Sequence, residues 1–216
     1  MSTVDSPVGV PAPLFFLSYS RPHRAAGGPF DYVPQFFEDL SVHVSELVGP
    51  EPGVDPGFMD STMSGGQRWT PELLRAAGTC QVFVPLLSSA LLGSDWCGRE
   101  WHAFSRRRVL SRSPGFSAHE TAIVPVNWSP THETDLPKVV RDIQRFSPTP
   151  MPADVVGKYE REGVYGLLTL RLENEYRAVV WRLAQRIVAI HRACRIEPLV
   201  PAGVGELRNL FAGGRG

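Results

Sequence analysis

Short, predominantly apolar runs alternate along this chain with segments whose apolar residues recur every three or four positions. The runs cover residues 14–17, 57–60, 81–87 and 122–126. Runs of this length and composition are typical of strands that are buried on both faces of a sheet. Their alternation with helical segments predicts an α/β domain in which a central parallel sheet is flanked by helices.

Two segments carry the clearest helical pattern. In the first, the apolar stripe begins at Val33, Pro34 stands near the start and Gly49-Pro50 follows the end, so we expect a helix over residues 33–48. The second is a long amphipathic helix with arginines on its polar faces, and its core stripe consists of Tyr176, Val179, Val180, Leu183, Ile187 and Ile190.

Two further helices are predicted from their start signals. Thr70 is a suitable N-cap before Pro71, with Gly78 as a C-terminal stop, and Ser94 is a suitable N-cap for the helix that follows it. Pro85 lies inside a predicted strand, where it can donate no ladder hydrogen bond, so we expect that strand to end or bulge there.

Length and composition are those of one globular domain. The 216 residues predict a domain over residues 14–194, with flexible, Pro- and Gly-rich tails over residues 1–13 and 195–216. Lys+Arg and Asp+Glu are both 22, which gives no electrostatic indication of nucleic acid or membrane binding. Three dispersed cysteines, no signal peptide and no apolar run of about 18 residues predict a cytoplasmic protein.

Several catalytic and cofactor fingerprints are absent. Neither GxGxxG nor GxxxxGK[ST] occurs, and neither His119-Glu120 nor His132-Glu133 is followed by a histidine at zincin spacing. A phosphoacceptor domain would need an acid after the first strand, where this chain has Ser18-Tyr19-Ser20. We therefore expect no metal and no resident cofactor.

Three segments together point to a family. Phe15-Phe16-Leu17-Ser18-Tyr19-Ser20 is an apolar strand that ends in Ser-Tyr. Gly57-Phe58-Met59-Asp60 precedes a Gly-containing loop and Trp69, and Ser94-Asp95-Trp96-Cys97-Gly98-Arg99-Glu100-Trp101 contains the pattern Ser-x-Trp-Cys-x-x-Glu. In this order they resemble the first strand, the second strand with its BB loop, and the Ser-x-Trp-Cys-x-x-Glu motif of Toll/interleukin-1-receptor (TIR) domains, over about residues 14–191.

Further segments resemble the TIR-like proteins that actinobacteria encode beside FxSxx-COOH peptides. These are Gly57-Phe58-Met59-Asp60, Val-Phe-Val-Pro-Leu at 82–86, Cys-Gly-x-Glu-Trp-x-Ala-Phe at 97–104, and Tyr165-Gly166. The resemblance implies a flavodoxin-like, three-layer TIR fold. It also implies a role in immune-type or stress signalling, with activity that depends on assembly of TIR units.

The resemblance implies a reaction as well. Many TIR domains cleave NAD⁺ between nicotinamide and ribose through the motif glutamate, which is Glu100 here. Nicotinamide leaves NAD⁺ as a neutral molecule, so no general acid is needed, and one carboxylate can stabilise the oxocarbenium-like transition state. NAD⁺ is then the substrate rather than a cofactor.

Other residues are assigned by position. Ser18, Tyr19 and Asp60 end strands at the edge where open α/β sheets bind ligands, and Trp96 lies one helical turn before Glu100. The candidate substrate-binding residues are Phe16, Ser18, Tyr19, Asp60 and Trp96. The candidate self-association residues, in the BB loop, are Ser64, Gly65, Gly66, Gln67 and Arg68. We expect Cys97 and Trp101 to pack in the core.

Structural roles remain open beside the functional ones. A glutamate in a first helical turn stabilises the helix dipole, an aspartate after a strand forms turns, and Tyr19 suits a core as well as a ligand. Two functions therefore stay open. One is an NAD⁺ glycohydrolase or cyclase, and the other is a non-catalytic TIR module that recruits another TIR protein. The loop after the first strand is long and rich in Gly and Pro, and the BB loop reads Ser64-Gly65-Gly66-Gln67 instead of the usual Pro-Gly; these departures keep the second function open.

Overall fold

A computed structural model describes residues 12–20, 32–49, 55–60, 70–112 and 121–212. Its central sheet has four parallel strands in the order β2-β1-β3-β5. They are β1 (Phe15–Ser18), β2 (Gly57–Met59), β3 (Val82–Leu87) and β5 (Val126–Asn127). All residues of β1 and β3 are buried, so the prediction of a parallel sheet with both faces covered is confirmed.

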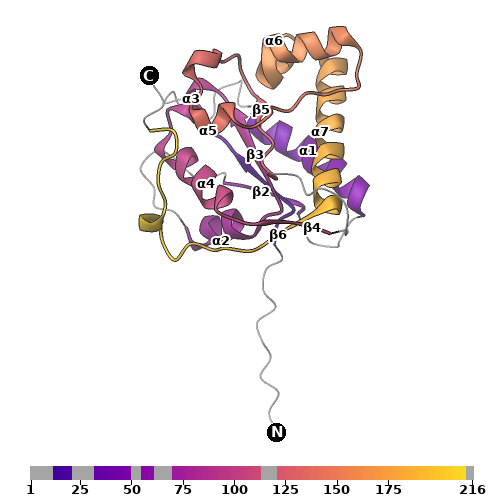
Figure 1. The fold of residues 1–216 in the computed structure, drawn as a ribbon. Coiled ribbons are helices and arrows are strands. Elements are labelled where there is room, and N and C mark those ends of the chain that lie inside the picture. Colours follow the sequence, from indigo (N-terminus) through magenta and orange to yellow (C-terminus); the bar gives the residue numbers. More distant parts are fainter. Residues whose placement is uncertain (1–11, 21–31, 50–54, 61–69, 113–120, 213–216) are drawn as a thin grey trace.

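Helices cover the sheet on both sides (Figure 1). The pair α1 and α7 packs on one side, and the pair α2 and α4 lies on the other. The helices are α1 (Val33–Val48), α2 (Pro71–Thr79), α3 (Ser89–Leu92), α4 (Asp95–Ser105), α5 (Lys138–Arg141), α6 (Ala153–Thr169) and α7 (Glu173–Ala193). No helix in the described ranges is both long and apolar enough to cross a membrane.

The predicted helices form where their patterns indicated. The predicted apolar stripe of α7 is buried from Tyr176 to Ile190. Thr70 caps α2 by accepting a hydrogen bond from the amide of Leu73, and Gly78 lies one residue before the last residue of that helix. Tertiary packing explains Gly78, because a Cβ there would lie 2.6 Å from the Cα of Val200.

Two strand predictions need correction. β3 continues through Pro85 to Leu87 without a break. Residues 122–126 do not form one strand: Ile123 makes an isolated bridge to Phe83, and β5 begins only at Val126, after Pro125. Pro125 has no amide hydrogen to donate, which agrees with the interruption there.

The C-terminal segment differs from the expected flexible tail. Two short strands, β4 (Val109–Ser111) and β6 (Cys194–Ile196), pair in an antiparallel ladder. The chain then runs past α2 and along α4, with the single-turn helix Val204–Glu206 on the way (Figure 1). Leu207 and Phe211 are buried, so apolar anchors hold a segment whose Pro- and Gly-rich composition suggested a loose end.

Candidate functional site

The site forms where β1 and α4 meet. β1 ends at Ser18, and its parallel neighbour β2 ends at Met59, directly before Asp60. α4 begins after Ser94, whose side chain accepts a hydrogen bond from the amide of Cys97 at 3.3 Å. The carboxyl ends of two strands and the first turns of a helix thus converge on one edge of the sheet, the usual ligand edge of an open α/β fold.

A buried hydrogen bond joins the two central residues. Ser18 Oγ donates to Glu100 Oε2, and the two residues are only 2% and 5% exposed. Their segments are far apart in the chain, so this contact exists only in the folded protein. It places a carboxyl group from the Ser-x-Trp-Cys-x-x-Glu segment against the end of the first strand.

Burial changes the acidity of Glu100. The pKa of the carboxyl group is raised from 4.5 to about 8, chiefly by burial; the Ser18 hydrogen bond lowers the pKa, and the negative charge of Asp60 raises it. Glu100 is therefore mostly protonated at neutral pH in this conformation. A group that must act as a carboxylate has to lose its proton first, either at higher pH or beside a bound cation.

Tyr19, Asp60 and Cys97 surround this pair. The Tyr19 hydroxyl donates to the carbonyl oxygen of Asp60 at 3.3 Å, and Cys97 Sγ donates to the carbonyl oxygen of Tyr19 at 3.5 Å. Burial, and then the charge of Glu100, raise the pKa of the Cys97 thiol far above its ordinary value. Cys97 is therefore a neutral thiol that ties α4 to β1, in agreement with the predicted packing role.

Phe16 and Trp96 lie in different surroundings. Phe16 is 1% exposed and packs against Phe58 and Phe83 with ring centroids 5.6 Å apart in each pair, so the structure places it inside the core. Trp96 is half-buried on the first turn of α4, and the guanidinium of Arg99 lies 5.8 Å from its ring centroid. The structure thus brings together Ser18, Tyr19, Asp60 and Glu100, with Trp96 one turn away.

The predicted self-association residues 64–68 lie outside the described residues. A cavity of about 610 Å³ lies elsewhere, between α1 and the start of α7, and is lined by residues that include Asp39, His43 and Tyr176. Among the described residues, none of the predicted site residues lines that cavity. The described ranges contain no group of three His, Cys, Asp or Glu residues arranged to hold a metal ion.

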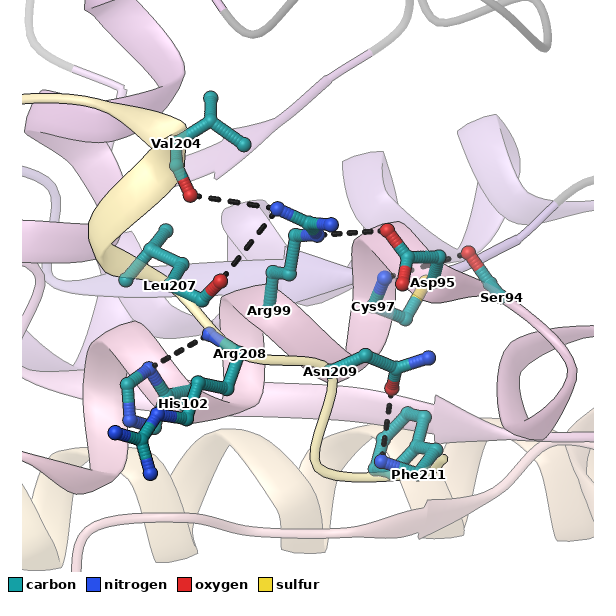
Figure 2. Close-up of polar contacts among 10 residues, drawn as sticks. All are labelled: Ser94, Asp95, Cys97, Arg99, His102, Val204, Leu207, Arg208, Asn209 and Phe211. Carbon is teal, nitrogen blue, oxygen red and sulfur yellow. Dashed lines mark hydrogen bonds and ion pairs between the residues drawn. The ribbon is translucent and has the colours of Figure 1, made fainter. Parts of the chain in front are cut away.

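The sequence pattern did not reveal the contact of residues 203–212 with the outer face of α4. Figure 2 shows Arg99 and His102 of α4 bonded to this segment. The only signal in the sequence is the spacing of Leu207, Leu210 and Phe211, which gives the segment an apolar side. This apolar pattern is short and is interrupted by the glycines around it, so it does not predict a packed segment.

Comparison with known protein families finds no family that matches the chain, and comparison with curated proteins finds no match either.

Proposed function

We propose that this protein is a TIR-type NAD⁺ glycohydrolase or cyclase that cleaves the bond between nicotinamide and ribose. The observation that carries the proposal is the contact between Ser18 and Glu100. It joins the two segments whose sequences resemble the first-strand motif and the glutamate motif of TIR domains. Each segment alone is a common local pattern. A functional site requires residues from different segments to lie together, and this contact brings the two segments together.

The topology supports a flavodoxin-like TIR fold. The order β2-β1-β3-β5 corresponds to the first four positions of the flavodoxin-like order 2-1-3-4-5. In that fold, ligands bind beyond the carboxyl ends of the strands, near the point where the strand order reverses. Ser18 ends β1 at this point, and Asp60 follows β2, so both belong to the edge at which NAD⁺ is proposed to bind.

The electrostatics of Glu100 suit a cationic substrate. The nicotinamide ring of NAD⁺ carries a positive charge, and a cation beside a carboxyl group lowers its pKa. Binding would therefore favour the ionised form of Glu100 at the ribose. As the bond breaks, the positive charge moves from the nicotinamide to the ribose, where the carboxylate stabilises it, and water or a second group of the substrate completes the reaction.

A second function is favoured by the burial of Glu100. A neutral glutamic acid that is 5% exposed and bonded to a serine is also a stable core contact. In this alternative the chain is a non-catalytic TIR module that recruits another TIR protein. In either case the proposed location is the cytoplasm, where the three cysteines, all buried and free, stay reduced.

The deciding experiment measures nicotinamide release from NAD⁺ at high protein concentration. Glu100→Gln is the sharpest variant, because it keeps the size of the side chain and an acceptor for Ser18 while it removes the charge. We expect a loss of at least a hundredfold in turnover. Equal turnover by wild type and variant would exclude Glu100 as the catalytic group, and an inactive wild type that still forms filaments would support the recruitment module.

A further inference from the structure

Residues 197–212, which we call the C-terminal belt, run across the outside of the α2–α4 layer (Figure 1). The belt starts where the Arg107 side chain donates to the carbonyl oxygen of Glu197 at 3.0 Å. At the end of α2, the amide of Leu199 donates to the carbonyl oxygen of Gly78 at 2.9 Å. The belt is therefore attached at the end of α2 and just after the end of α4, rather than to a single neighbour.

On α4 the belt is held mainly through its backbone (Figure 2). Arg99 donates to the carbonyl oxygens of Val204 and Leu207 at 3.3 and 3.5 Å, and the amide of Arg208 donates to His102 Nδ1 at 3.2 Å. The amide of Leu210 donates to the carbonyl oxygen of Gly98 at 3.3 Å. Each bond is individually modest, so the belt is held by several weak contacts at once.

Gly98 makes the close approach feasible. A Cβ at this position would lie 1.8 Å from Asn209 Oδ1 and 2.8 Å from Asn209 Cγ. Asn209 itself accepts a hydrogen bond from the amide of Phe211 at 2.8 Å, and the Phe211 ring meets the edge of Trp101 with centroids 5.7 Å apart. A methyl group at position 98 therefore displaces the Asn209 side chain from its place and crowds the amide nitrogen of Leu210, which would lie 3.2 Å from the new Cβ.

The belt and Glu100 lie on opposite faces of α4. At 100° per residue, Gly98 and His102 point about 160° away from Glu100 around the helix. The belt therefore contacts the outer face, while Glu100 faces β1 and bonds to Ser18. A substrate that touches Glu100 has to reach a group that is 5% exposed and bonded to Ser18, and outward movement of α4 from β1 on that side would uncover it.

We propose that the C-terminal belt is an autoinhibitory clasp that holds α4 against β1 and keeps Glu100 closed against Ser18 until the belt is released. The inhibitory consequence rests on the function proposed above, whereas the mechanical link between belt and Glu100 does not. The belt lies outside the α2–α4 layer and resists outward movement of α4. Release of the belt permits α4 to separate from β1, and this separation exposes Glu100.

The test uses the full chain with Gly98→Ala, which adds one methyl group where Asn209 lies and favours the helix itself. The matched control is Gly157→Ala in α6, where a built Cβ meets nothing within 4 Å. Asn209→Ala combined with Gly98→Ala removes the two nearest atoms and serves as a rescue, with Asn209→Ala alone as its reference because that change also removes the bond to Phe211. Phe211→Ala is a second way to loosen the belt, through its apolar anchor.

Three readouts are measured. Amide hydrogen exchange follows the belt, the side-chain carboxyl signal of Glu100 in carbon NMR gives its titration midpoint, and nicotinamide release gives activity. For Gly98→Ala we expect belt exchange at least tenfold faster than in Gly157→Ala, a Glu100 midpoint lowered from about 8 toward its ordinary value, and faster nicotinamide release. The double variant should return toward wild type in all three.

The outcomes separate the two proposals. A loosened belt with an unchanged Glu100 midpoint overturns the clasp, and so does unchanged belt exchange in both Gly98→Ala and Phe211→Ala. A lowered midpoint without nicotinamide release in any variant supports the mechanical link and contradicts the NAD⁺ hydrolase. A lowered midpoint with slower nicotinamide release overturns autoinhibition, because the belt would then position Glu100 for catalysis.

Discussion

At the scale of single residues, Glu100 is the group whose environment matters most. Its carboxyl group is almost completely buried, receives one hydrogen bond from Ser18 and lies in the field of Asp60. Burial dominates these effects, so the neutral form is favoured well above the ordinary pKa of a glutamate. The same burial that makes Glu100 a stable core group thus determines the conditions in which it can act as an anion.

The first prediction concerns the pH dependence of activity. If the carboxylate form of Glu100 is the active one, kcat/KM for NAD⁺ should rise with pH, with a midpoint near 8. Between pH 7 and pH 9 the expected rise is about tenfold. In Ser18→Ala the midpoint should move to higher pH, because the hydrogen bond that lowers the pKa is lost. A rate that is flat over this range argues against an ionising Glu100.

The second prediction concerns stability. Between pH 4.5 and about 8 the folded protein keeps a proton on Glu100 that the unfolded chain has already lost, so rising pH favours the unfolded state. Relative to Glu100→Gln, the free energy of unfolding of wild type should fall by about 1.4 kcal/mol per pH unit in this window. Urea unfolding of both proteins at pH 5, 7 and 9 measures the difference. Parallel pH curves would contradict a buried, neutral Glu100.

At the scale of elements, α4 makes contacts on three sides, and Trp101 touches both the core and Phe211 of the belt. Its core face places Trp101 and Phe104 against Phe83, its sheet-edge face presents Glu100 to Ser18, and its outer face receives the belt. The periodicity of a helix makes this division unavoidable, because residues three or four apart share a face. α4 therefore carries the belt contact on its outer face and the buried Glu100 on another face.

A second element, α6, contains a kink that the sequence pattern does not predict. Gly163 has a φ of +64° inside the helix and lies beside the carbonyl group of Trp128, where a Cβ would be 2.5 Å from the oxygen. Positive φ without steric cost requires glycine. The kink also lets the amide of Tyr165 donate to that same carbonyl oxygen at 2.8 Å, which fixes α6 to the end of β5.

The third prediction uses two glycines of this one helix. Gly163→Ala should lower the free energy of unfolding by about 3 kcal/mol or more, because both the positive φ and the contact with Trp128 become unfavourable. Gly157→Ala, in open space, should raise it by about 0.5–1 kcal/mol. Chemical unfolding of the two variants measures both effects. Equal effects of the same sign would contradict the kinked geometry.

At the scale of the whole molecule, the sheet lies between two helix layers that have different relations to the site. The α1–α7 layer is joined by a broad apolar contact, and Tyr176 of α7 donates to Asp39 of α1 at 2.6 Å. The α2–α4 layer carries the site and is crossed by the belt. Movement at the site is therefore expected within the α2–α4 layer, while α1 and α7 hold the core.

The fourth prediction concerns assembly and rests on the proposed function. If TIR units act together, nicotinamide release per molecule should rise with protein concentration, in parallel with self-association in sedimentation velocity. Replacing Gln67 and Arg68 by alanine should weaken both, since the resemblance assigns residues 64–68 to self-association. A specific activity independent of concentration would show that one copy is sufficient.

Much of the fold could be predicted because it is encoded locally. The stripe that begins at Val33 and the stripe from Tyr176 to Ile190 are periodic over many residues, so they predict α1 and α7 well. Ser94 predicts the start of α4 through its capping side chain. The 122–126 run was less informative, because an apolar run does not say how many of its residues find a strand partner.

The sequence by itself determined the helices α1, α2, α4 and α7, the approximate positions of the strands of the central sheet and, through the resemblance, which glutamate to single out. Only the tertiary structure decided that Glu100 is buried and protonated against Ser18, because burial depends on segments distant in the chain. It also decided that residues 197–212 form a belt. Composition suggested a loose tail, whereas two buried anchors, Leu207 and Phe211, and the space left by Gly98 hold the belt in place.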